Sequence, residues 1–242
     1  MEIIFGIHAV EEALAARGRA FEYVAILPGR GDARIQKIAQ QCRSAGVAVR
    51  TMPRDQLTRL AKNAAHQGVV AVTAAKSYVD LEEILAQRRG KYAFIAVLDG
   101  VEDPHNLGAI IRTAEGAGVD GIVIPERRAT GITGTVVKSS AGASEYLPIA
   151  KVTNISRTVD ELKSRNVWIV GLDERGEKLY HQIDFKMDCA IVLGAEGHGL
   201  HEQIRKKCDF VVSIPMLGKV SSLNVSVAAG IVMYEIARQR LS

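Results

Sequence analysis

The sequence contains few cysteines, and they are poorly placed for any cross-link. Cys42, Cys189 and Cys208 are far apart, odd in number and form no C-x-x-C pair. This pattern disfavours a disulfide framework and a cysteine zinc site, and it is typical of buried thiols in a reducing compartment. The six histidines have no metal-ligand set around them. We therefore expect a cytosolic protein without a metal.

Long apolar runs are also missing. The longest, Val227–Tyr234, is far shorter than the roughly 20 residues that a membrane-spanning helix needs, so no membrane association is expected. The first residues lack the basic segment and cleavage site of a signal peptide. Apolar residues make up 48% and charged residues 24% of the 242-residue chain, a balance that excludes a disordered or fibrous protein. The length allows one large domain or two modest ones.

The net charge of +4 is modest, but it is unevenly distributed. Arg17–Lys62 contains ten basic and three acidic residues, whereas residues 91–242 contain 18 of each. A basic first third is typical of a module that binds a polyanion, most often nucleic acid. A solvated basic face without a partner explains the charge count equally well.

Residues 1–75 show the alternating periodicities of a small α/β domain. Apolar spacing and capping residues predict helices over 7–16, 32–45 and 53–62, and strands over 23–27, 47–51 and 69–74. Residues 76–90 are expected to form a linker with one short polar helix.

Residues 91–242 are predicted to form a second α/β domain with a mostly parallel sheet. Strands are expected at 93–98, 121–124, 167–172, 190–193 and 210–214, and helices at 106–118, 132–142, 154–165, 199–207 and 222–240. Buried β-branched strands that alternate with helices favour a parallel sheet covered on both faces. Ligands of such sheets bind at the carboxyl ends of the strands, where three loops are unusual.

The first unusual loop, residues 98–108, leads into a helix. Asn106 is expected to be the N-cap. The helix has a core-facing stripe formed by Leu107, Ile110, Ile111 and Ala114. Arg112 lies about 140° from Leu107 around the helix axis and therefore off that stripe. By itself it could be a surface arginine paired with Glu115.

The second loop follows the strand at 190–193 and carries Gly194, Gly197 and Gly199. Their G-x-x-G-x-G spacing permits close approach of a ligand to the backbone, but it is the reverse of the dinucleotide fingerprint. Glu196 inside the turn would repel a pyrophosphate, which disfavours NAD. Glu196 could instead cap the following helix.

The third loop, residues 214–224, precedes the last helix. That helix has apolar residues on two faces, one with Leu223, Val227, Ile231 and Tyr234 and the other with Val225, Ala229, Val232 and Ile236. Two apolar faces need two partners, of which one could be a second chain. The alternative is complete burial within one domain.

In this order and at these separations, the three loops resemble the three sequence motifs of the SpoU family of RNA ribose 2′-O-methyltransferases. The resemblance covers residues 91–242. The opening FGIHAVEEAL and the later HQGVVA are similar to the substrate-binding domain of that family, which is like ribosomal proteins of the L30 type. Within the family, the resemblance is strongest to the bacterial enzymes that methylate a guanosine in the peptidyl-transferase loop of large-subunit ribosomal RNA.

The resemblance implies S-adenosylmethionine as cofactor, a C-terminal trefoil knot that forms its pocket, and a homodimer through the C-terminal domain. The implied substrate is large-subunit ribosomal RNA. Cofactor binding is assigned to the backbone around Leu193, Gly194, Gly197, Ile214, Met216 and Leu223. The catalytic set is Arg112, oriented by Asn106, together with Glu196, Ser222 and Asn224.

Two rival functions and one open question remain at this point. The chain could methylate tRNA, or it could be a non-catalytic ribosomal-RNA-binding assembly factor. A decayed enzyme should have lost Asn106, Arg112, Glu196 or Asn224, and all four are present. Arg112 could be the general base or could stabilise the developing alkoxide and bind a phosphate. We prefer the second role because the pKa of arginine exceeds about 12.

Overall fold

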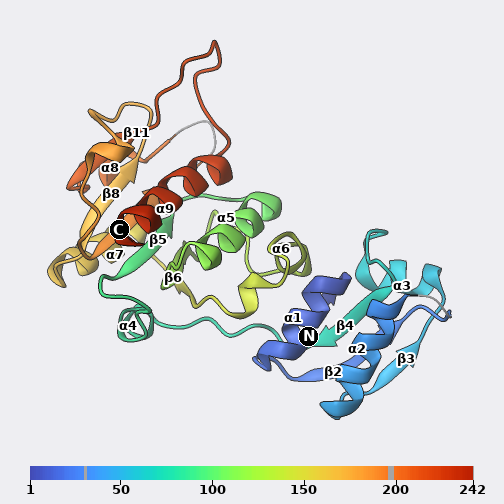
Figure 1. Ribbon diagram of the computed structural model, residues 1–242. Helices are drawn as coiled ribbons and strands as arrows, with labels where there is room; N and C mark the ends of the chain where they lie inside the picture. Colours follow the sequence, from blue (N-terminus) through green and yellow to red (C-terminus); the bar gives the residue numbers. More distant parts are fainter. Residues whose placement is uncertain (30–31, 196–198, 242) are drawn as a thin grey trace. The chain divides into compact units, whose positions relative to one another are not determined.

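The computed structural model describes residues 1–29, 32–195 and 199–241. The chain divides into two compact units. The N-terminal unit comprises Met1–Ser77 with Gly131–Tyr146, and the C-terminal unit comprises Tyr78–Thr130 with Leu147–Ser242. Figure 1 shows the elements of both.

The N-terminal unit is built on a four-stranded sheet in the order β1-β4-β2-β3. The β2–β3 pair is parallel and the other two pairs are antiparallel. The strands are β1 (Glu2–Phe5), β2 (Phe21–Ile26), β3 (Val49–Thr51) and β4 (Val69–Thr73), and the helices are α1 (Ile7–Ala16), α2 (Ala33–Ser44), α3 (Arg54–Ala61) and α6 (Gly134–Ser139).

Local chemistry explains most of these elements. The Asp32 side chain accepts a hydrogen bond from the Arg34 backbone N–H (3.0 Å), and α2 begins directly after this cap. One face of the sheet buries Phe5, Leu57 and Val70 in a common core. Strand β1 was not predicted, because four residues are too few to display an alternating pattern.

The segment 131–146 packs with the N-terminal unit, which differs from the expected continuous domain over 91–242. The physical reason is a buried ion pair: the Arg19 guanidinium donates from Nε and Nη2 to the Glu145 carboxylate, both at 2.9 Å. Glu2 also pairs with Arg19, whose side chain has no exposed surface. Arg19 therefore belongs to the core of this unit and is not one of its surface cations.

The C-terminal unit contains a seven-stranded sheet in the order β7-β6-β5-β10-β8-β11-β9, with every neighbouring pair parallel. Its strands are β5 (Phe94–Leu98), β6 (Gly121–Pro125), β7 (Ile149–Val152), β8 (Trp168–Leu172), β9 (Lys178–Leu179), β10 (Cys189–Leu193) and β11 (Phe210–Ser213). The predicted parallel α/β sheet is thereby confirmed. Strands β7 and β9 were missed, because β7 has four residues and β9 two, too few to display a strand pattern.

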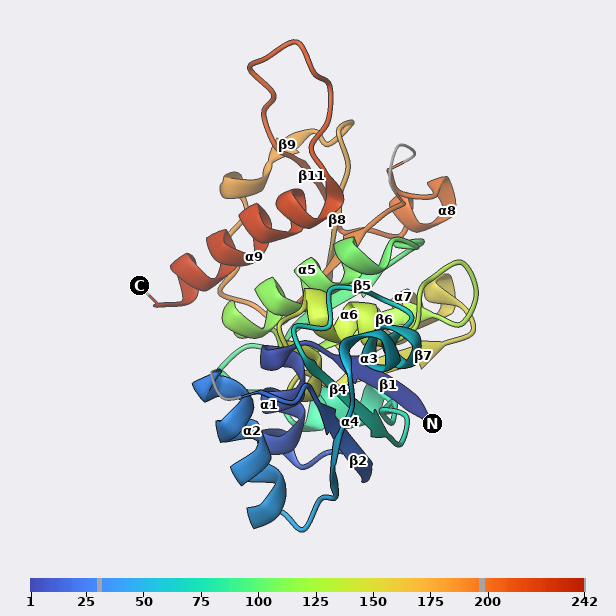
Figure 2. The ribbon, with the colours of Figure 1, turned by 90° about the vertical axis from the view of Figure 1, so that its right-hand side faces the viewer.

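Helices lie on both sides of this sheet, as Figure 2 shows. They are α4 (Leu81–Ala86), α5 (Pro104–Gly116), α7 (Ile155–Ser164), α8 (Glu202–Arg205) and α9 (Val225–Leu241), with short 3-10 turns at Ala143–Glu145 in the N-terminal unit and Tyr180–Gln182 here. Alternate residues of the central strands pack with α4, α7 and α8 in one core. Helices α5 and α9 pack together on the other side.

The short helix expected within residues 76–90 is present as α4, but it packs on the C-terminal unit instead of lying in a free linker. Leu81 and Ile84 of α4 are buried in the core of the C-terminal unit. Gly121 of β6 makes room for this contact, since a Cβ there would lie 2.7 Å from Ile84. An apolar pair one helical turn apart therefore docks α4 on the sheet.

Helix α9 buries one of its two predicted apolar faces, formed by Val225, Ala229, Val232 and Ile236. Its last turn is held by Arg240, whose guanidinium donates to the carbonyls of Tyr92 (3.0 Å) and Phe185 (3.1 Å). The other predicted face stays open, with Val227 51% and Tyr234 55% exposed. None of the helices in the described residues is long and apolar enough to cross a membrane.

Candidate functional site

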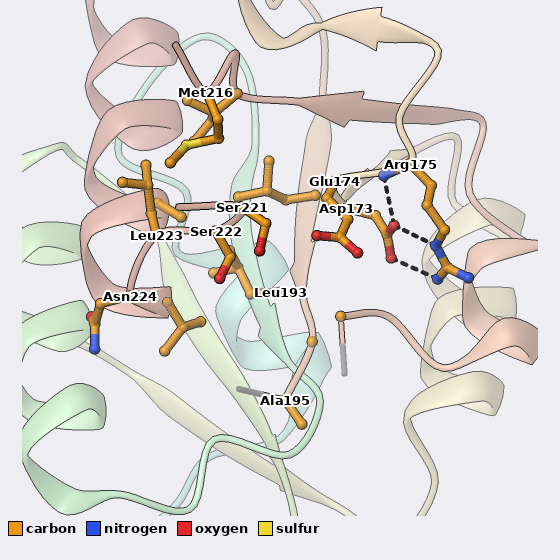
Figure 3. A pocket seen from close by; sticks show the side chains of 16 residues that line it. Asp173, Glu174, Arg175, Leu193, Ala195, Met216, Ser221, Ser222, Leu223 and Asn224 are labelled. Carbon is orange, nitrogen blue, oxygen red and sulfur yellow. Dashed lines mark hydrogen bonds and ion pairs between the residues drawn. The ribbon is translucent and has the colours of Figure 1, made fainter. Parts of the chain in front are cut away.

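A pocket of about 650 Å³ lies in the C-terminal unit at the carboxyl ends of β8, β10 and β11. This volume is typical of small-molecule sites. Figure 3 shows its wall. The described lining residues are Leu172, Asp173, Glu174, Arg175, Leu193, Gly194, Ala195, Gly199, Ile214, Met216, Ser221, Ser222, Leu223, Asn224, Val225 and Ala228.

The loop after β10 doubles back on itself at the edge of this pocket. Ala195 and Gly199 form a bridge, in which the Gly199 N–H donates to the Ala195 carbonyl at 3.2 Å. A Cβ on Gly194 would lie 1.9 Å from the Gly199 carbonyl oxygen. The absence of a side chain at position 194 is therefore required by the returning backbone, whether or not a ligand is bound.

Asp173 ties the same loop to the end of β8. Its side chain is almost wholly buried and accepts hydrogen bonds from Arg175 Nε (2.8 Å), Arg175 Nη2 (2.9 Å) and the Leu200 N–H (3.1 Å). The Arg175 hydrogen bonds are the main reason why the pKa of Asp173 falls to about 2.

This lowered pKa predicts how acid affects stability. Because the folded pKa is below the unfolded value, Asp173 stabilises the fold above about pH 4, by about 2 kcal/mol, and loses this effect as the pH falls towards 2. Asp173→Asn should therefore be about 2 kcal/mol less stable than the parent at pH 6 and should approach it near pH 2. Urea unfolding across this pH range measures the difference. A constant gap would contradict the prediction.

A second contact holds the loop from the side of β5. Asp99 directly follows β5 and is buried, and its Oδ2 lies 2.6 Å from His201 Nδ1. The Asp99 N–H donates to the Leu193 carbonyl at 2.8 Å. The ends of β5, β8 and β10 are thus joined around the pocket by Asp99, Asp173 and their partners.

Asn106 and Asn224 meet although they are far apart in the sequence. Asn224 Nδ2 donates to Asn106 Oδ1 at 3.0 Å, which joins the start of α5 to the segment before α9. The expectation that Asn106 is the N-cap of its helix is wrong. Asp103 caps α5, accepting from the N–H groups of His105 and Asn106, because Pro104 occupies the first helical position. The Asn106 side chain is therefore available for Asn224.

Arg112 lies on α5 off the buried stripe, as predicted, and is exposed. Within the described parts of the chain its guanidinium makes no hydrogen bond or ion pair, and it does not line the pocket. Glu115, the partner that the alternative required, lies 3.8 Å from Arg89 Nη1 instead. The surface pair of Arg112 with Glu115 is therefore not formed.

The structure gathers most of the predicted site residues. Those that line the pocket are Leu193, Gly194, Ile214, Met216, Ser222, Leu223 and Asn224. Asn106 does not line the pocket itself but is hydrogen bonded to Asn224, which does. Glu196 and Gly197 lie outside the described residues. Among the described residues, no cluster of three or more His, Cys, Asp or Glu side chains could hold a metal.

Three residues of the pocket were not predicted from the sequence, namely Asp173, Glu174 and Arg175. Their stretch, followed by Gly176, has the composition of an ordinary charged surface turn. One signal was available, because these residues follow a predicted buried strand, at the edge of the sheet where ligands bind.

Two family models match the chain. The model described as SpoU rRNA Methylase family matches residues 93–234, and the model described as RNA 2'-O ribose methyltransferase substrate binding matches residues 3–79.

Similar proteins cover nearly the whole chain. A protein of Staphylococcus aureus (strain COL), assigned by name to the TrmH family of tRNA/rRNA methyltransferases, is 43% identical over 98% of this chain and 96% of its own length. A similarly named protein of Bacillus subtilis (strain 168) is 41% identical, over 99% and 96%. The SpoU methyltransferase AviRb of Streptomyces viridochromogenes, solved with AdoMet, has a TM-score of 0.82 at 26% identity, covering 99% of this chain and 90% of AviRb. An AdoMet-bound rRNA methyltransferase of Sinorhizobium meliloti has a TM-score of 0.82 at 25% identity, with coverage of 100% and 88%.

Proposed function

The chain belongs to the SpoU rRNA Methylase family, and on that premise we propose that it methylates the ribose 2′-oxygen of a guanosine in large-subunit ribosomal RNA. Membership makes it an RNA 2′-O-methyltransferase that uses S-adenosylmethionine. The observation that carries the proposal is a pocket lined by the second and third motif segments, to which Asn106 of the first segment is joined by its hydrogen bond with Asn224.

The residues around the pocket fit this cofactor. Leu193, Ile214 and Leu223 supply an apolar wall for a flat base, while Glu174, Ser221 and Ser222 supply polar groups for the rest of the molecule. When bound, the cofactor supplies an activated methyl group on a sulfonium. The protein must align a ribose hydroxyl with that methyl group and help to remove one proton.

We assign to Arg112 the stabilisation of the 2′-oxygen as its proton leaves to solvent water. Its guanidinium is exposed and uncommitted among the described residues, so it is available to an RNA phosphate and to the alkoxide that develops on the 2′-oxygen. Arginine stays protonated at neutral pH, and a fixed cation stabilises developing negative charge without itself changing protonation state. Asn106 and Asn224 position the reacting groups, and Glu196 and Ser222 complete the proposed polar set.

The N-terminal unit is proposed to bind the RNA. Its exposed cations outside the buried Arg19 support this role, and they are Arg17, Arg34, Lys37, Arg43, Arg50, Arg54, Arg59 and Lys62. Such cations release counterions from the RNA, and single-stranded loops expose the sugars that the enzyme must reach.

The function is tested by transfer of a labelled methyl group. The purified protein is incubated with S-adenosylmethionine and, separately, with large-subunit RNA, small-subunit RNA and tRNA from a strain that lacks this protein. We expect label in large-subunit RNA alone, at one guanosine whose 3′ linkage resists alkali. Label in tRNA would replace the proposed substrate, and no label in any RNA would favour a non-catalytic binding protein.

We further propose a homodimer through the C-terminal unit. The open face of α9, with Val227 51% and Tyr234 55% exposed, is an apolar surface that a second copy would cover. Light scattering on the full chain at micromolar concentration should report a dimer, and Val227→Glu should convert it to a monomer. Gln203→Glu on α8 makes the same charge change away from α9 and should leave the dimer intact. A parent monomer would contradict the proposal.

Two finer features of the family are also proposed for this chain. The C-terminal segment is proposed to be threaded as a trefoil knot, as the resemblance to the family implies. A cytoplasmic location is proposed because ribosomal RNA is the expected substrate and the three cysteines are free thiols.

A further inference from the structure

Glu174 is a pocket residue that neither the sequence motifs nor the proposed chemistry uses. It is the second residue after β8, and β8 pairs with β10, which is followed by Gly194. Figure 3 shows its carboxylate directed into the pocket towards Ser221. Among the described residues it makes no hydrogen bond or ion pair, whereas the neighbouring Asp173 and Arg175 are engaged with each other. The pocket therefore contains a carboxylate ready to accept hydrogen bonds from a ligand.

The position of Glu174 excludes a direct part in methyl transfer. Asn224, which pairs with Asn106, lies at the other end of the pocket in Figure 3. The proposed reaction belongs at that end, because Asn106 and Asn224 of the proposed catalytic set meet there. Glu174 thus faces a part of the cofactor that does not react.

Resting on the proposed function, we infer that Glu174 accepts hydrogen bonds from the ribose hydroxyls of S-adenosylmethionine and selects the cofactor by its sugar. Two neighbouring hydroxyls match the two oxygens of a carboxylate, and acids at strand ends of parallel sheets commonly bind ribose in this way.

The amino-acid end of the cofactor fits Glu174 less well. An acid that binds the ammonium group would also face the carboxylate attached to the same carbon. That carboxylate would need a cation, and Arg175 is the single cation among the described lining residues. The Arg175 guanidinium already donates two hydrogen bonds to the Asp173 carboxylate. The ribose is therefore the better partner.

Calorimetry with cofactor fragments tests the inference without any RNA. Glu174→Ala should raise the Kd for S-adenosylmethionine by about tenfold or more, the range for a lost hydrogen bond to a charged group. It should raise the Kd for 5′-methylthioadenosine, which keeps the ribose and lacks the amino-acid end, by the same factor. The 2′,3′-dideoxy form of 5′-methylthioadenosine should bind parent and variant equally. Glu177→Ala, at an exposed acid three residues away that does not line the pocket, is the matched control.

Each result decides the question. An unchanged Kd for 5′-methylthioadenosine with a raised Kd for S-adenosylmethionine would assign Glu174 to the ammonium and overturn the inference. Unchanged values for both ligands would overturn it as well. A parent protein that binds neither ligand would instead defeat the proposed function. Equal thermal unfolding temperatures of parent and variant confirm that the exposed position leaves the fold intact.

Discussion

Arg112→Ala is expected to bind S-adenosylmethionine as tightly as the parent and to transfer methyl groups at least about 100-fold more slowly. Arg112 is exposed, off the buried stripe of α5 and absent from the pocket wall, so neither the core nor the cofactor loses a contact. Loss of one group that stabilises charge in a transition state costs about 100-fold to 1,000-fold in rate. Single-turnover methylation at saturating RNA and cofactor measures this rate directly.

Arg112→Lys separates charge from geometry. Lysine keeps the positive charge but lacks the fork that binds a phosphate through two hydrogen bonds. We therefore expect a large loss of rate here too. Arg157→Ala, at an exposed arginine of α7, serves as the control and should turn over like the parent. An Arg112→Ala enzyme within about threefold of the parent would show that Arg112 has no part in the reaction.

Gly194→Ala should lower both stability and cofactor affinity. The added Cβ would lie 1.9 Å from the Gly199 carbonyl oxygen and 2.7 Å from the Leu200 nitrogen, so the loop that borders the pocket must move. Overpacking of this kind typically costs about 1–3 kcal/mol. Because the displaced loop also forms part of the pocket wall, the Kd for S-adenosylmethionine should rise by more than about tenfold. Urea unfolding and calorimetry measure the two effects.

Gly218→Ala provides the matched control for this packing effect. Gly218 belongs to the loop between β11 and α9, and nothing lies within 4 Å of a Cβ built there. Neither glycine has a positive φ among the described backbone angles, so backbone strain does not distinguish them. The control should keep its stability and affinity. A Gly194→Ala protein indistinguishable from Gly218→Ala would show that the loop adapts without cost.

The sequence by itself determined the architecture of the chain and most of the pocket. Apolar runs such as 94–98 and 189–193 alternate with helices along the chain, a pattern that favours a covered parallel sheet, so their type was predictable. The side of the sheet that carries the ligand follows from parallel topology alone. The resemblance to the SpoU motifs added the residues: it assigned Leu193 and Ile214 to the cofactor and Asn224 to the catalytic set, and all three line one pocket.

Only the tertiary structure decided which polar groups are occupied and which are available. Arg19 counts as a surface cation in the sequence, yet it is buried against Glu145, 126 residues away. Asp173 and Glu174 are both acidic residues of one turn. Asp173 accepts hydrogen bonds from Arg175 and Leu200, whereas the Glu174 carboxylate faces the pocket. Local sequence cannot encode this difference, because an ion pair or hydrogen bond between distant segments depends on where the folded chain brings them together. The same reason explains why the pairing of Asn106 with Asn224, across 118 positions, appears only in three dimensions.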